Sequence, residues 1–95
     1  MKVVLSTFFI AGVQYSDGVS SILYKGEILL SQKEPNNLID KYAISIYRNN
    51  IKLGYIPRHL NRKLYNIKDI LIEVEEYYPD APPWERILVS VFLEE

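Results

Sequence analysis

The fold is decided around the stretch KEPNNLIDKYAI at residues 33–44, which is followed ten residues later by GYIPR at residues 54–58. In the first stretch, Pro, Asn and Asp residues separate two apolar segments of strand-like composition. Asn and Asp side chains hydrogen-bond the backbone nearby and proline bends it, so we expect a structured loop between two strands. A loop of this kind is a better place for a binding site than a core segment.

The segments around this loop are typical of short strands. β-Branched and aromatic residues, or an alternation of apolar and polar residues, predict strands at residues 3–15, 26–32, 43–47, 51–56, 70–77 and 86–93. Gly12 offers a place for a bulge or bend in the first strand, and Asp17-Gly18 a turn after it. Asn49-Asn50 is a favourable two-residue hairpin connection. Six strands of this length indicate an antiparallel sheet.

One segment is compatible with a helix. It begins at Pro57, and Leu60, Leu64 and Ile67 follow at spacings of four and three, which places them on one face. About six strands and one short helix predict a mainly β fold, a small OB/SH3-like antiparallel β-barrel. At 95 residues the chain is expected to form a single domain, 1–95, with one modest core.

Composition narrows the functional classes. The chain has no cysteine and one histidine, His59, which argues against thiolate chemistry and against cysteine-rich or multi-histidine metal sites. No phosphate-binding loop or nucleophile motif is visible, so we expect no catalytic residue, no metal and no cofactor. The apolar run at residues 1–10 is interpreted as a strand and not as a signal peptide, and no run approaches the roughly 18 residues of a membrane span. We expect a cytoplasmic protein without membrane contact.

Charge is unevenly distributed along the chain. Residues 1–68 hold ten of the eleven Lys and Arg with only four Asp and Glu, a balance of +6. Residues 69–95 hold one Arg with eight Asp and Glu, a balance of −7, so the net charge is −1. This division predicts a basic face and an acidic face, which would steer charged partners.

The order of these motifs resembles the HIRAN domain. The resemblance rests on Gly12-Val13-Gln14-Tyr15, on Gly26-Glu27-Ile28-Leu29-Leu30, and on the two stretches quoted above, at their separation. It covers nearly the whole chain. It implies an OB- or SH3-like barrel that occurs fused to Swi/Snf-type translocases of DNA repair and as stand-alone bacterial or phage-type proteins. In the repair translocases the domain captures the 3′-hydroxyl end of single-stranded DNA.

The resemblance also implies roles for individual residues. Tyr15 takes the place of a base-stacking aromatic, Asp40 that of the aspartate that hydrogen-bonds the terminal 3′-hydroxyl, and Asn37 holds the loop beside it. Arg58 corresponds to a basic residue that contacts phosphate. Tyr78 and Trp84 lie in a loop that supplies another aromatic against the end base.

Four positions depart from the family's pattern. Gln14 replaces an arginine, and Ser16 replaces a second tyrosine. Gln14 still belongs to the residues that we predict to bind nucleic acid. Ile39 replaces an aromatic before the aspartate, and Leu38 a proline. Loss of a cation and two rings weakens a site that depends on phosphate neutralisation and on stacking of about 1–3 kcal/mol per base.

Each candidate residue also has a structural interpretation. Asp40 can cap backbone amides in the loop instead of binding a ribose hydroxyl. Tyrosines in small barrels commonly fill cross-strand pairs, and we assign Tyr47 and Tyr65 to structure. The basic residues at the helix can neutralise phosphates or form a solvated face; they are Arg58, His59, Arg62 and Lys63.

Two functional hypotheses follow. The first is a non-catalytic nucleic-acid-binding module for single-stranded DNA, particularly its 3′ end, in DNA repair or fork processing. The second is a protein-interaction or adaptor module whose acidic segment, residues 69–95, contacts a partner such as a helicase or nuclease. The sequence leaves open the choice between DNA and RNA and the oligomeric state.

Overall fold

A computed structural model describes residues 1–16 and 20–95. The elements in chain order are β1 (Lys2–Phe9), the 3-10 turn η1 (Val13–Tyr15), β2 (Ile28–Lys33), β3 (Ile44–Arg48), β4 (Ile51–Tyr55), α1 (Arg58–Tyr65), β5 (Leu71–Tyr77), the 3-10 turn η3 (Pro83–Glu85) and β6 (Ile87–Glu94). The fold is mainly β with one α-helix in the described part of the chain, as the sequence predicts.

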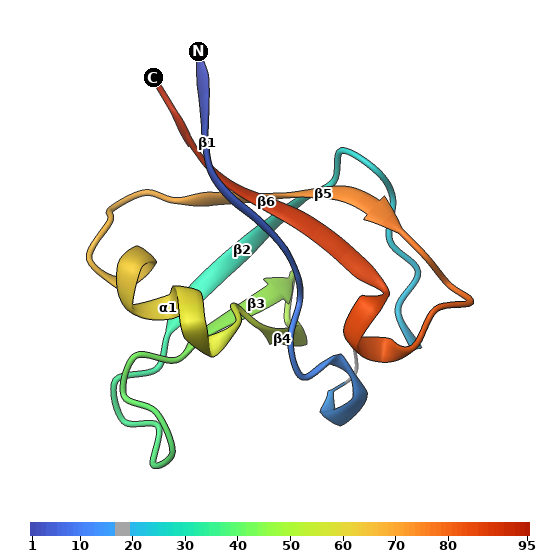
Figure 1. Ribbon diagram of the computed structural model, residues 1–95, viewed down its shortest axis with the longest axis horizontal. Helices are drawn as coiled ribbons and strands as arrows, with labels where there is room; N and C mark the ends of the chain where they lie inside the picture. The colour runs from blue at the N-terminus through green and yellow to red at the C-terminus, as the bar shows by residue number, and fades with distance from the viewer. Residues whose placement is uncertain (17–19) are drawn as a thin grey trace.

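The strands form one antiparallel sheet in the order β1-β6-β5-β2-β3-β4. Long β6 and β1 cross over β2, so the sheet curls into a barrel-like shape (Figure 1). The sheet does not close into a continuous barrel. Its two outer strands are joined through an isolated bridge between Ala11 and Tyr55. Their backbone N–H groups donate reciprocally to the opposite carbonyls, at 2.9 and 2.8 Å. This bridge places the end of β1 directly beside the end of β4.

The core lies inside the curl. Alternate residues of β6 point inward, and Ile87, Val89 and Val91 have no exposed surface, as expected for period-2 strands with one buried face. α1 covers one open end of the curl with Leu64 buried and Leu60 packed against the core, while Arg62 and Lys63 are exposed. The helix therefore sits next to the loop between β2 and β3 (Figure 1).

Two expectations for the N-terminal segment need correction. The strand predicted over 3–15 ends at Phe9, and the irregularity in its ladder lies between Val4 and Ser6, not at Gly12. Gly12 instead has φ of 73° and precedes the η1 turn. A single hydrophobic run thus contains a strand and a turn, because the left-handed backbone at Gly12 ends the extended conformation. The expected Asp17-Gly18 turn lies outside the described residues.

The remaining elements differ from expectation by one or two residues at their ends. Arg48 pairs with Ile51, which confirms the two-residue connection Asn49-Asn50, and Asn49 adopts a left-handed conformation with φ of 52°. The loop 78–85 contains η3, which the sequence did not predict. Pro83 fits this turn because its φ is already restricted.

Candidate nucleic-acid interface

The loop between β2 and β3 is held by its own Asn and Asp side chains. Asn37 Oδ1 accepts hydrogen bonds from the backbone N–H groups of Ile39 at 2.9 Å and Asp40 at 3.0 Å. Asp40 Oδ1 accepts one from the N–H of Tyr42 at 2.9 Å. The backbone-capping role considered for Asp40 is therefore present, and it fixes the direction of the carboxylate.

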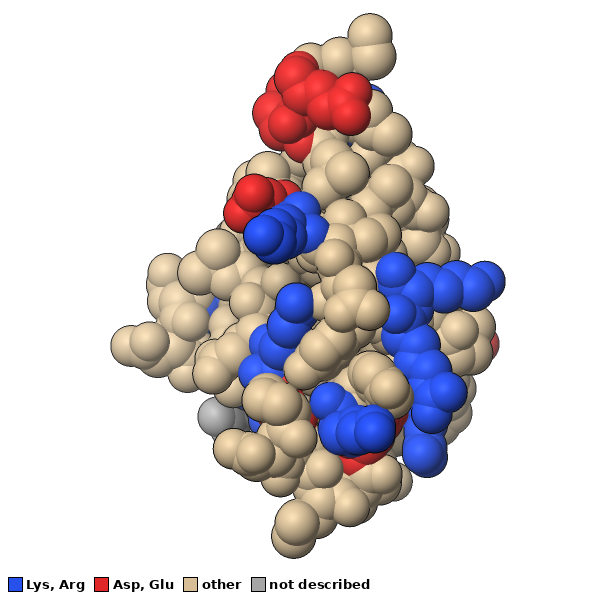
Figure 2. Space-filling view, turned by 90° about the vertical axis from the view of Figure 1, so that its left-hand side faces the viewer, with Lys and Arg blue, Asp and Glu red and all other residues tan. Residues whose placement is uncertain are grey.

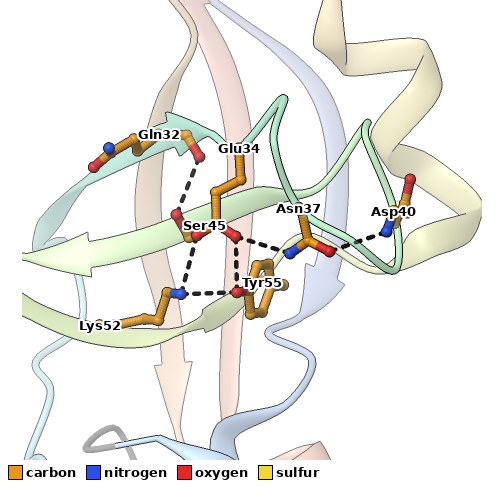
Figure 3. A network of polar contacts seen from close by, with 7 residues as sticks. All are labelled: Gln32, Glu34, Asn37, Asp40, Ser45, Lys52 and Tyr55. Atoms are coloured by element: carbon orange, nitrogen blue, oxygen red, sulfur yellow. Dashed lines mark hydrogen bonds and ion pairs between the residues drawn. The ribbon is translucent and has the colours of Figure 1, made fainter.

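A polar network anchors this loop to the neighbouring strands (Figure 3). Glu34 Oε1 accepts from Asn37 Nδ2 at 3.0 Å and from the Tyr55 hydroxyl at 3.0 Å. Lys52 Nζ lies 3.0 Å from Glu34 Oε2 and donates to the Tyr55 hydroxyl at 2.7 Å. The loop is thereby connected to β4 through charge-assisted hydrogen bonds, which are stronger than neutral ones.

This network shifts the acidity of both charged members. Partial burial opposes ionisation of Glu34, but its hydrogen bonds outweigh burial and lower its pKa from the ordinary 4.5 to about 2. The partners, in decreasing order of effect, are Asn37, Lys52, Tyr55 and Ser45. Burial likewise opposes the charge on Lys52, yet its contacts with Tyr55 and Glu34 raise the pKa of Lys52 well above its ordinary value. Both groups are charged at neutral pH.

Glu34→Gln is expected to reduce the free energy of unfolding by about 1–3 kcal/mol at pH 7, the usual loss for a hydrogen bond to a charged group. The folded pKa of Glu34 lies below its ordinary value, so its stabilisation is complete above about pH 4.5 and is lost as pH falls towards about 2. Denaturant unfolding between pH 2 and 7 should show a flatter profile for Glu34→Gln than for wild type. The exposed Glu85→Gln is the matched control, and an equally flat profile for it would contradict this assignment.

Asp40 is held from a second side by the helix. Asn61, which is only 2% exposed, donates through Nδ2 to Asp40 Oδ2 at 2.8 Å. Arg58 Nε lies 3.5 Å from the same oxygen. The hydrogen bond from Asn61, then that from the Tyr42 N–H and the charges of Arg58 and Arg62, lower the pKa of Asp40. A carboxylate has about four acceptor positions, so the ionised Asp40 can take a further hydrogen bond from a ligand.

These residues line a pocket of about 290 Å³ between the loop, α1 and the bridge of the outer strands. Its wall is formed by Ala11, Gly12, Asn37, Ile39, Asp40, Ala43, Tyr55, Ile56, Arg58 and Asn61. Apolar walls with a few fixed polar groups are typical of small-ligand sites, and this volume is at the lower end of their range. The pocket therefore has room for one small ligand group.

The structure brings together three of the nine residues predicted for the site. Asn37, Asp40 and Arg58 line the pocket. Gln14 and Tyr15 lie on η1 immediately after the pocket residue Gly12, and Tyr15 is 87% exposed. Neither residue is part of the pocket wall.

The other four predicted residues lie outside the pocket wall. Trp84 is 57% exposed on η3, which contacts η1, so Trp84 and Tyr15 are carried by neighbouring turns. Tyr78 packs against Phe9 with 6.3 Å between ring centroids. His59 and Arg62 are exposed on α1.

Sequence reasoning missed Asn61 and the pairing of Glu34 with Lys52 and Tyr55. The signal for Asn61 would have been its position three residues before Leu64, which puts a polar side chain on the apolar side of the helix, where burial requires a partner. Glu34 and Tyr55 each belong to a quoted motif, but only the fold shows that the two motifs meet.

Within residues 1–16 and 20–95, no helix is long and apolar enough to cross a membrane. Across the same described residues, no group of three or more His, Cys, Asp or Glu is placed to hold a metal ion.

The fold and the pocket define a class of protein: a small, mainly β, barrel-like domain with a pocket between a structured loop and a single helix. The chain belongs to the HIRAN domain family, which matches residues 3–95. The resemblance seen in the sequence is thereby confirmed.

Two solved structures are similar to this chain. A crystal structure of a protein from Lactobacillus plantarum superposes with a TM-score of 0.81 at 26% sequence identity, covering 97% of this chain and 94% of that one. The crystal structure of the HIRAN domain of human HLTF superposes with a TM-score of 0.70 at 20% identity, covering 96% of this chain and 77% of that one. At that identity the second likeness shows the fold alone. The search of curated proteins found no match.

Proposed function

We propose that this protein is a non-catalytic binding module that holds the 3′-hydroxyl end of single-stranded DNA in the pocket beside Asp40. The observation that carries the proposal is the ionised carboxylate, fixed by the Tyr42 N–H and by the buried Asn61, next to the Arg58 guanidinium. Membership of the HIRAN family supports it, because the family resemblance assigns the same aspartate to a terminal hydroxyl.

The chemistry of the pocket favours a hydroxyl over a phosphate at the strand end. Asp40 accepts hydrogen bonds and repels anions, whereas Arg58 is 76% exposed and attracts them. A 3′-terminal nucleotide offers both required groups: its free hydroxyl donates to Asp40, and its bridging phosphate lies towards Arg58. A 3′-phosphate would bring two like charges together in the pocket.

At two of the positions that depart from the family's pattern, the structure shows what the residue of this chain does. Ser16 Oγ donates to the carbonyl of Leu53 at 2.7 Å, so it ties η1 to β4 where a stacking ring is absent. Ile39 is 83% exposed and lines the pocket, which gives it an apolar wall without a π-face. We therefore expect binding that depends on Asp40 and Tyr15 more than on several stacked bases.

Tyr15→Ala is expected to weaken strand binding about 10-fold, because stacking of one base on an aromatic ring contributes about 1–3 kcal/mol. Fluorescence anisotropy with a labelled oligothymidylate measures the change. Tyr24→Ala removes another exposed ring that does not line the pocket. Equal binding by the two variants would rule out stacking on Tyr15.

The proposal is tested by titrating the wild-type protein with two identical short strands that end in a 3′-hydroxyl or a 3′-phosphate. The hydroxyl strand should bind at least about 10-fold more tightly, as expected for a hydrogen bond to a charged group. Equal affinities would reject end capture, and no binding of either strand at low salt would reject nucleic-acid binding itself.

The acidic segment supports the alternative adaptor function less well. Glu73 and Glu76 form ion pairs with Lys2 and Lys25, and the N-terminal amine lies 3.5 Å from Glu94. Several of its carboxylates are thus partly neutralised within the domain itself.

A further inference from the structure

A second cluster of charged and aromatic side chains lies beside the pocket, along α1. Tyr42 and Tyr65 pack edge to face with 5.5 Å between ring centroids. The Arg62 guanidinium lies 4.7 Å and Lys41 Nζ 5.3 Å from the centre of the Tyr42 ring, and Lys33 Nζ lies 4.7 Å from that of Tyr65. We call these five residues the basic ridge.

The ridge is continuous with the pocket. Tyr42 supplies the N–H that binds Asp40 Oδ1, and Arg62 follows the pocket residue Arg58 by four positions, one helical turn further along α1. From Arg58 to Tyr65 the helix measures about 12 Å, the axial length of three to four phosphates in a stacked strand. A polymer whose end lies in the pocket can therefore reach the ridge without a gap.

The cations of the ridge are available to a ligand. Among the ion pairs of the described residues, none involves Lys33, Lys41 or Arg62, and all three side chains belong to exposed residues. By contrast, Lys2 and Lys25 are paired with Glu73 and Glu76. Figure 2 shows the same division: Lys and Arg gather over the face that carries α1, and acidic residues gather towards the chain termini.

The rings hold these cations in place. A cation over an aromatic face gains about 0.5–1 kcal/mol at an exposed site, so the three charges are less free than ordinary surface lysines. Two cations on one ring repel each other, and an anion placed between them relieves that repulsion. This arrangement fits a chain of phosphates better than a single neutral ligand.

We propose that the basic ridge binds the backbone phosphates of the DNA strand that leads away from the end held in the pocket. The proposal rests on the proposed function and adds a second binding surface to it. Of the five ridge residues, the sequence analysis predicted a role in binding for Arg62 alone. Tyr65, assigned to structure from the sequence, acts here as the support for Lys33. The pocket selects the end and the ridge adds affinity without base preference.

The test compares two double variants with equal charge change, Lys33→Gln/Lys41→Gln in the ridge and Lys2→Gln/Lys25→Gln at two lysines that are paired with glutamates. Each is titrated at several salt concentrations with a labelled twelve-nucleotide oligothymidylate that ends in a 3′-hydroxyl or a 3′-phosphate. The ridge variant should bind both strands about 10-fold more weakly and lose about 1.4 from the slope of log affinity against log salt, about 0.7 for each phosphate contact. Its ratio of affinities for the two ends should stay at the wild-type value.

Each of the other outcomes contradicts the proposal that the ridge binds backbone phosphates. If both double variants bind as wild type does, the ridge makes no contact, while end capture in the pocket stands. If the ridge variant loses the preference for the hydroxyl end, the lysines belong to the pocket and not to a second surface. If wild type itself binds neither strand, the proposed function and the ridge fail together.

Discussion

Asp40→Asn is expected to lower the affinity for a strand with a 3′-hydroxyl about 10- to 100-fold, the loss of a hydrogen bond to a charged group. Affinity for the 3′-phosphate strand should remain the same or rise, because the variant removes the repulsion between two anions. The opposite response of the two strands is what separates a direct contact from general damage to the loop. Anisotropy titrations of both strands measure it.

The substitution also carries a structural risk that needs a control. Asparagine can still accept the Tyr42 N–H through its carbonyl oxygen, but its amide would face the Nδ2 group of Asn61, which is itself a donor. Thermal unfolding by circular dichroism shows whether the variant is folded at the temperature of the titration. Asp80→Asn, in the exposed loop after β5, is the matched control. Parallel losses for both strand ends would contradict the assigned contact.

Gly54→Ala is expected to destabilise the domain by about 3 kcal/mol, through overpacking and through damage to a hydrogen-bonded bridge. A Cβ at this position would stand 2.3 Å from the Ala11 carbonyl oxygen and 2.7 Å from Ile10 Cγ2. The two outer strands must then separate where Ala11 and Tyr55 are bridged. For a chain of this size, the midpoint of thermal unfolding should fall by about 15 °C.

The control for Gly54 is Gly26→Ala. Gly26 has φ of +87° but no atom within 4 Å of its ideal Cβ position, so alanine there adds backbone strain of about 1 kcal/mol without a clash. Its melting point should fall by about 5 °C. Similar losses for the two variants would show that conformational strain, and not the close approach of the strands, explains the glycine at position 54.

Much of the fold could be predicted because local patterns agree with it. The alternation of β5 and β6 and the Asn49-Asn50 hairpin gave strands whose ends are within two residues of those observed. The N-terminal error has a local cause. A strongly apolar run over 3–15 hides the left-handed residue Gly12, and strand composition alone does not show where a chain turns.

The site was harder to predict because its residues come from three segments that are distant in the sequence, at residues 11–12, 37–43 and 55–61. Asn37 and Asp40 could be predicted from the loop motif, and Arg58 from the GYIPR stretch. Asn61 could not be predicted in this way, because its role depends on where α1 packs against the loop. The basic ridge depends in the same way on the contact of Tyr65 with Tyr42 and Lys33.

The most direct measurement is an NMR titration of the ¹⁵N-labelled protein with a short single strand of DNA that ends in a 3′-hydroxyl. The changes in the amide chemical shifts are the readout. The account predicts that the largest shifts occur in the loop at residues 37–42, at Gly12, and at the start of α1 around Arg58. These shifts should become smaller when the strand ends in a 3′-phosphate. No shift in the loop, or shifts confined to the acidic strands β5 and β6, would contradict the account.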